Sequence, residues 1–205
     1  MNDLPLVQSA LDEETARAEV YGLLAELYYA APSAALHESL KVAVTQAPVP
    51  GAVLEGAWSG LVAAARAQTT AEIALEYDAL FGGMGKPEVY LFGSHYLSGF
   101  LNEKPLAALR QDLAVLGLER DQAVSETEDH IAYLCEVMRY LIAGDDAAIA
   151  NLTRQREFFA VHLAPWLPAL CDKIMAHPKA TFYAALAAFT REFSGVEAQG
   201  FDMLE

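Results

Sequence analysis

The stretch SETEDHIAYLCEVM, residues 125–138, has a polar, acidic first half and an apolar second half. In the second half, Ile131, Leu134 and Met138 follow one another at steps of three and four residues. Side chains with this spacing share one face of an α-helix, so the apolar half predicts a helix. The polar half contains four candidate functional residues, Glu126, Glu128, Asp129 and His130.

Ser125 and Glu128 have the three-residue spacing of a capping box, in which two side chains satisfy backbone N–H groups at the start of a helix. We therefore predict a helix that starts at this pair and runs to Ala143, just before Gly144. Such a start would place three polar side chains on one arc of the first turn, namely Glu126, Asp129 and His130.

Helical periodicity extends over nearly the whole chain, and no stretch alternates convincingly between apolar and polar residues as a half-buried strand does. Thr69 and Glu72 form another capping-box pair, Pro105 suits the first turn of a helix, and Gly117 suits a left-handed C-terminal cap. The sequence therefore predicts an all-α fold, a compact globular bundle of roughly eight to ten helices.

Two further helix boundaries are predicted near the C-terminal end. Asp146 can cap a helix from Ala147 to about Leu163, and Pro165 then kinks or restarts it, with helix continuing from Trp166 to Met175. The residues after Gly195 are expected to be irregular.

Residues 82–94, GGMGKPEVYLFGS, form the longest segment that is predicted to be non-helical. A long loop inside a helical domain is more often functional than idle. The segment is glycine-rich, but it lacks the spacing of a phosphate-binding loop. We expect residues 1–205 to form a single all-helical domain, with a sub-domain hinge near residues 82–104.

Composition and charge exclude several classes of protein. The formal net charge is −15, which argues against nucleic-acid binding, because that requires a concentrated basic surface. No apolar run reaches the roughly 20 residues of a spanning helix, so no stable membrane insertion is expected. The N-terminus lacks the order of a secretion signal, and the two cysteines form no CxxC motif. These features predict a cytoplasmic protein.

Several interpretations of the polar half of residues 125–138 stay open from the residues alone. Acids at a helix start are favoured by the helix dipole without any ligand. A neutral imidazole of His130, held by a neighbouring carboxylate or carbonyl, is the simplest structural interpretation. A metal-dependent hydrolase using His130 and Asp129 has weaker support, because the sequence offers no second pair of ligands. Ser94 and Cys135 lack the surroundings of a catalytic nucleophile.

Aromatic and apolar residues gather around the glycine-rich loop. They are Tyr77, Leu80, Phe81, Tyr90, Phe92 and Tyr96. Loops lie at the surface and leave such side chains partly open. An apolar, aromatic cleft beside an acidic helix start would suit a peptide with a basic head and an apolar middle.

Five blocks in order resemble the TorD/DmsD family of redox-enzyme maturation chaperones. They are EYDALFGG, YLFGSHYLSG, ALRQDLAVLGL, ETEDHIAYLCEVMRYLIAG and QREFFAVHLAPW, and they cover roughly residues 72–170. The family's aromatic-xx-Leu-Phe motif matches Tyr77, Leu80 and Phe81. Its Glu-Pro-x-Asp-His motif matches Glu126, Asp129 and His130, and its aromatic-Gly-Ser segment matches Phe92, Gly93 and Ser94.

The resemblance implies a cytoplasmic chaperone, not an enzyme. Such proteins bind the twin-arginine leader, and often the body, of a molybdenum enzyme's precursor, and they delay export until the molybdopterin cofactor is inserted. The chain itself is expected to hold no cofactor or metal, and GTP binding does not follow from any motif. A cofactor- or nucleotide-binding maturation factor without leader binding is the alternative. The matched regions, together with Tyr90 and Tyr96, are the expected client-binding residues.

This sequence departs from the family pattern at three positions. Thr127 and Leu91 stand where the family commonly has proline, and Tyr77 stands where some members have tryptophan. The conformations of the loop and of the segment before Ile131 are therefore expected to differ. The sequence does not identify the client enzyme, and it is compatible with a monomer or with a dimer that exchanges elements.

Overall fold

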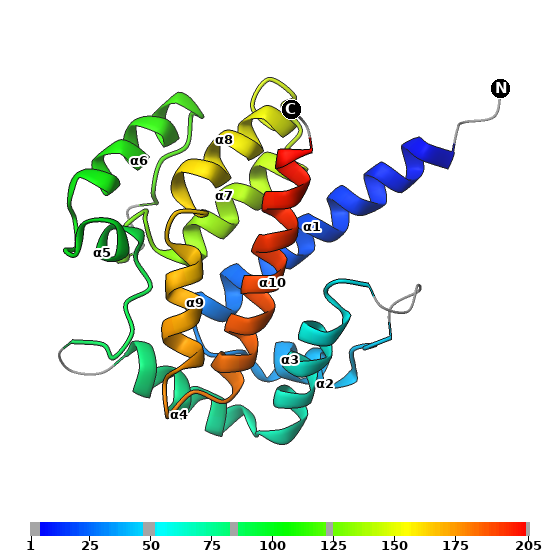
Figure 1. The fold of residues 1–205 in the computed structure, drawn as a ribbon, viewed down its shortest axis with the longest axis vertical. Helices are drawn as coiled ribbons and strands as arrows, with labels where there is room; N and C mark the ends of the chain where they lie inside the picture. Colours follow the sequence, from blue (N-terminus) through cyan, green and yellow to red (C-terminus); the bar gives the residue numbers. More distant parts are fainter. Residues whose placement is uncertain (1–4, 47–51, 83–85, 122–124, 204–205) are drawn as a thin grey trace. The chain divides into compact units, whose positions relative to one another are not determined.

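The computed structural model describes residues 5–46, 52–82, 86–121 and 125–203. These residues form ten α-helices and no strand, and one isolated antiparallel bridge joins Phe92 and His130. The all-α prediction and the predicted number of helices are confirmed (Figure 1). Within the described ranges, no helix is long and apolar enough to cross a membrane.

The contacts between residues divide the chain into two units, each built from two separate segments. Unit 1 consists of residues 1–29 and 92–163, and unit 2 consists of residues 30–91 and 164–205. Unit 1 contains α1 (Pro5–Tyr29), α5 (Gly93–Ser98), α6 (Lys104–Val115), α7 (Ile131–Ala143) and α8 (Leu152–His162). Unit 2 contains α2 (Ala34–Val42), α3 (Glu55–Ala67), α4 (Thr70–Phe81), α9 (Leu167–Met175) and α10 (Phe182–Asp202).

One boundary between the units, at Leu91 and Phe92, falls inside the segment that the sequence marks as a hinge. The glycines Gly83 and Gly85 of that segment lie outside the described residues. A single domain with a hinge near residues 82–104 stays a prediction.

In unit 1, α7 packs against both α1 and α8, and α5 packs against α6. Figure 1 shows α7 and α8 side by side. The apolar half of residues 125–138 forms the buried face of α7, with Ile131, Leu134 and Met138 almost fully enclosed. Burying a side chain of this size stabilises the fold by about 1.5–3 kcal/mol. Cys135 lies on the same helix and is a buried cysteine outside any disulfide.

In unit 2, α10 packs against α9, α3 and α4. Its buried side chains include Phe182, Leu186, Phe189 and Phe193, and the buried free thiol of Cys171 lies on α9. The predicted irregular tail after Gly195 is wrong, because α10 continues to Asp202. Packing explains the difference: Phe201 is buried, and this contact outweighs the low helix propensity of glycine.

Local sequence signals set several helix ends as predicted. In the capping box of α4, the Thr69 hydroxyl accepts a hydrogen bond from the Glu72 N–H at 3.2 Å, and the Glu72 carboxylate accepts one from the Thr69 N–H at 2.7 Å. Pro105 lies in the first turn of α6, where its missing N–H has no cost. Gly117 follows α6 with φ of 71°, in the left-handed region.

The predicted start of α8 at Asp146 is wrong. The Asp146 carboxylate accepts a hydrogen bond from the Ala148 N–H at 2.9 Å, but it caps only a turn. The helix begins at Leu152, where the Asn151 side chain accepts from the Arg154 N–H at 3.1 Å. Asn and Asp are equally good caps, and the chain uses both in succession.

Candidate functional site

Helix α4 carries three of the predicted binding residues. Leu80 is fully buried, so it belongs to the core of unit 2 and is closed to a ligand. Tyr77 and Phe81 are partly exposed and lie on one side of the helix, with ring centroids 5.2 Å apart. The four-residue spacing of these two aromatics brings the rings together.

Both rings also pack on Tyr183 of α10. The centroid distances are 5.6 Å from Tyr77 and 5.0 Å from Phe81, and the Phe81 contact is edge-to-face. Burial, together with nearby Tyr77 and acidic groups, raises the pKa of the Tyr183 hydroxyl. The aromatic motif of α4 therefore holds α4 and α10 together within unit 2, in addition to any role toward a ligand.

The described end of the glycine-rich loop returns to α4. The Val89 N–H donates to the Leu80 carbonyl at 3.0 Å, and Val89 and Leu91 are buried. Tyr90, between them, is partly exposed. Alternate side chains of this extended stretch therefore point inward, and Tyr90 stays accessible.

Glu76 is a key residue of unit 2 that the sequence analysis did not single out. Its carboxylate is 7% exposed and accepts hydrogen bonds from three successive backbone N–H groups at the start of α10. The donors are Thr181 at 2.8 Å, Phe182 at 3.1 Å and Tyr183 at 2.8 Å. Gln68 donates a fourth at 3.0 Å. The sequence could have identified Glu76, because an acid between Ile73 and Leu80 on the apolar face of α4 is buried and needs hydrogen-bond partners.

In unit 1, the predicted helix start at Ser125 is wrong. Helix α7 begins at Ile131, and the Nδ1 atom of His130 caps it by accepting a hydrogen bond from the Ala132 N–H at 3.2 Å. Ser125 and Glu128 do not form a capping box, because Glu128 forms ion pairs elsewhere in unit 1. The predicted arc of Glu126, Asp129 and His130 on a first helical turn is therefore also wrong.

Asp129 joins the segment before α7 to helix α5. Its carbonyl accepts from the Gly93 N–H at 2.9 Å, and its carboxylate accepts from the Ser94 N–H at 2.9 Å. The second carboxylate oxygen accepts from the Thr127 hydroxyl at 2.6 Å. Asp129 is 4% exposed. Its carboxylate thus holds α5 in place, and Thr127, at the position of the family's proline, helps to orient it.

His130 lies inside a group of aromatic rings. The centroid of its ring is 5.0 Å from Phe92, 5.9 Å from Tyr133 and 6.4 Å from Tyr29. Burial lowers the pKa of His130 to about 4, against the opposing effect of the Asp129 charge. Burial, with the neighbouring Tyr29 hydroxyl, also raises the pKa of Tyr133 to about 12. The ring of His130 is therefore neutral at physiological pH, as its role as a hydrogen-bond acceptor requires.

Glu126 and Glu128 differ in their partners. Glu128 accepts from Arg110 at 2.8 Å and lies 3.8 Å from Arg120. Partial burial opposes ionisation of Glu128, but the two arginines outweigh it and lower its pKa. Glu126 is partly exposed, and among the described residues no basic side chain pairs with its carboxylate. Its charge also contributes to the raised pKa of Tyr133, one ring of the aromatic group.

The structure thus brings four of the predicted residues into direct contact in unit 1, namely Phe92, Ser94, Asp129 and His130. Glu126 and the half-buried Tyr96 belong to the same unit. Tyr77, Leu80, Phe81 and Tyr90 belong to unit 2. That one ligand touches both groups stays a prediction.

The metal-site interpretation gains no support from the described ranges of the chain, where no group of three or more His, Cys, Asp or Glu side chains could hold an ion. In particular, Nδ1 of His130 is used by the Ala132 N–H, and both carboxylate oxygens of Asp129 accept hydrogen bonds.

Comparison with known proteins relates this arrangement to a family. Residues 51–172, more than half of the chain, match the family model described as nitrate reductase delta subunit. Chaperone protein TorD of Vibrio cholerae serotype O1 is 27% identical over 129 residues, which are 60% of this chain and 59% of that protein. Chaperone protein TorD of Vibrio parahaemolyticus serotype O3:K6 is 24% identical over 135 residues, 62% and 63% of the two chains. The chain spans about three-fifths of the length of these curated relatives.

Proposed function

The chain belongs to the nitrate reductase delta subunit family, and from this we propose that it is a chaperone for the maturation of a molybdenum enzyme. In the proposed function it acts in the cytoplasm, where it binds the twin-arginine leader and the body of the precursor. It delays export until the molybdopterin cofactor is inserted, and it catalyses no reaction itself. The resemblance to the TorD/DmsD family that the five sequence blocks predicted is confirmed.

The observation that carries the leader-binding part is the position of Glu126. Its carboxylate is partly exposed and pairs with no basic side chain among the described residues, and its charge contributes to the raised pKa of Tyr133, one of the rings around His130. An arginine of the leader can form a planar, two-pronged hydrogen bond with such a carboxylate. The net charge of −15 adds a general attraction for a cationic peptide.

Asp129 has a different role in this proposal. The sequence suggested that Asp129 and Glu126 both pair with the leader's arginines. Since both carboxylate oxygens of Asp129 already accept hydrogen bonds, we assign Asp129 to positioning α5 against the segment before α7, and we assign the arginine contact to Glu126.

Calorimetric titration with a synthetic twin-arginine leader peptide tests the proposal. Glu126→Gln is expected to weaken binding about five- to tenfold, since it removes one charge-assisted pair, and to flatten the dependence of affinity on salt. The matched control is Glu119→Gln, which removes an exposed charge of the same unit and should leave affinity within about twofold. Absence of leader binding by the unaltered protein would reject the leader-binding function.

The two acids can be separated in the same titration. Asp129→Ala should weaken binding because α5 loses its anchor. If Asp129 only positions α5, the dependence of affinity on salt keeps its slope; if it pairs with an arginine, that slope falls as it does for Glu126→Gln. Unchanged affinity and unchanged salt response would exclude both roles for Asp129.

A further inference from the structure

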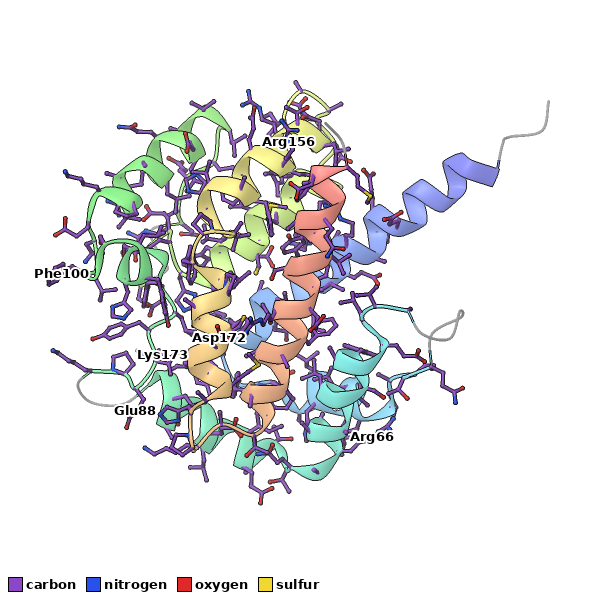
Figure 2. The ribbon with its side chains drawn as sticks, viewed as in Figure 1. Arg66, Glu88, Phe100, Arg156, Asp172 and Lys173 are labelled. Carbon is purple, nitrogen blue, oxygen red and sulfur yellow. The ribbon has the colours of Figure 1, made fainter. Side chains whose placement is uncertain are left out.

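The last turn of α5 and the turn that follows it expose three large apolar side chains close together in sequence. Phe100 is 70% exposed, Leu97 42% and Leu101 41%. Figure 2 shows Phe100 pointing away from the ribbon at the outer edge of the α5–α6 part. Single exposed apolar residues are ordinary, but three within five successive positions, here called the patch, are a candidate binding surface.

The backbone of this turn is fixed. Gly99 ends α5 in the left-handed region with φ of 80°, and its N–H donates to the His95 carbonyl at 3.0 Å. Asn102 also has a positive φ, of 59°. The Ser98 hydroxyl lies 2.7 Å from the Ser94 carbonyl and 3.1 Å from the Phe100 carbonyl, and it can donate to either. The apolar side chains are therefore presented by a braced turn.

The patch belongs to the same unit as the acidic segment. Gly93 and Ser94, at the start of α5, are hydrogen-bonded to Asp129, and the six residues of α5 rise about 9 Å from there to the turn. An extended peptide covers about 3.3 Å per residue, so about three residues of such a peptide match the length of α5.

The acidic residue and the apolar patch of the chain can match the basic pair and the apolar segment of a leader. Among the described residues no basic side chain pairs with the Glu126 carboxylate, although Arg120 donates to the Glu126 backbone carbonyl at 3.3 Å. Beside the patch, the exposed Glu103 and Lys104 have opposite charges. A twin-arginine leader carries its basic pair first and its apolar segment next. By contrast, Leu80 is fully buried and Phe81 packs on Tyr183, so the α4 motif serves the core of unit 2.

We propose that the apolar segment of the leader docks on Leu97, Phe100 and Leu101 while its basic pair contacts Glu126. This inference rests on the proposed function, and it moves the main apolar contact from the α4 motif of unit 2 to the turn after α5 in unit 1. Tyr96 and Phe92, on and just before α5, would line the path between the two contacts.

Titration of the full chain with the synthetic leader peptide tests the docking site. Phe100→Ala is expected to weaken binding at least tenfold, to make the heat-capacity change of binding less negative, and to keep the salt dependence of the unaltered protein. The matched control is Leu75→Ala on α4, which is also 70% exposed and should bind the leader as the unaltered protein does. Equal urea midpoints would show that both variants are folded.

A second peptide sharpens the test. A shortened leader that keeps the basic pair but lacks the apolar segment should bind the unaltered protein and Phe100→Ala equally. If the full leader binds the unaltered protein and Phe100→Ala within about twofold of each other, the docking site is overturned and the proposed function stands. If the unaltered protein binds neither peptide, the proposed function fails, and the docking site fails with it.

Discussion

His130 has two roles at the scale of a single residue. Its Nδ1 atom caps α7, and its ring lies among Phe92, Tyr29 and Tyr133. The sequence suggested a neutral imidazole held by a carboxylate or a carbonyl. In the structure the nitrogen instead accepts a backbone N–H, which a protonated ring cannot do.

The capping role predicts a dependence of stability on pH. The pKa of His130 is about 4 in the folded protein, against 6.5 for the free side chain, so between these values the unfolded chain binds a proton that the folded one does not. This contribution to stability is therefore complete above about pH 6.5 and is lost as the pH falls toward 4. The loss is on the order of 3 kcal/mol.

His130→Asn provides the comparison, because asparagine can cap α7 but does not titrate. Urea unfolding at pH 7 and at pH 4.5 should show a smaller loss of unfolding free energy in the variant than in the unaltered protein. Equal losses would mean that the folded protein accepts a proton at His130 as readily as the unfolded chain does.

At the scale of elements, Glu76 connects two helices far apart in sequence. It lies on α4, and its carboxylate takes the place of a capping side chain for α10, whose own N-cap residue Thr181 makes no side-chain cap hydrogen bond. A carboxylate at this position also complements the positive end of the helix dipole.

Glu76→Ala should lower the free energy of unfolding by roughly 2–4 kcal/mol, because it leaves backbone donors at the start of α10 without a partner. Urea unfolding measures the change. Glu38→Ala is the control: this acid is 66% exposed and pairs with Lys41 at 2.6 Å, and such a surface pair is worth under about 1 kcal/mol. A loss of similar size in both variants would contradict the capping role of Glu76.

The sequence predicted helix ends well where neighbouring residues decide them. Thr69 and Glu72 form their capping box, and Pro105 and Gly117 bound α6 as expected. It failed where a distant partner competes. Glu128 has capping-box spacing with Ser125, but Arg110 and Arg120, which come earlier in the chain, bind it instead. Periodicity contains no information about such pairings.

The candidate site shows the same limit. The motifs identified Phe92, Ser94, Asp129 and His130, which do contact one another in unit 1. Spacing alone placed Asp129 on a helix with open oxygens, whereas tertiary hydrogen bonds use both of them. The sequence also does not determine which apolar side chains are exposed. Leu80 and Phe100 are both apolar, yet Leu80 is fully buried and Phe100 is 70% exposed.

At the scale of the whole molecule, the chain passes between the two units three times, at residues 29–30, 91–92 and 163–164. Each unit contains one buried cysteine thiol, Cys135 in unit 1 and Cys171 in unit 2. Burial raises the pKa of Cys171 to about 12, so it reacts only when its surroundings open.

These thiols test the prediction of a single domain. If the chain unfolds as one, both thiols should become reactive at the same urea concentration. Each unit separates the two segments of the other along the chain, so unfolding either unit lengthens the loop that the other has to close. Thiol labelling followed by mass spectrometry of the two peptides measures this, and Cys135→Ala and Cys171→Ala assign the signals. Labelling of one thiol well before the other would show two independently unfolding units.

The interleaved segments also set an order of events during synthesis. Unit 1 needs nothing beyond Leu163, whereas unit 2 includes α9 and α10, which follow it in the chain. At about 5–20 residues per second, these last two helices leave the ribosome several seconds after unit 1 has all of its segments. The junction of α5 with Asp129 can therefore form on a nascent chain whose other half still lacks its longest helix.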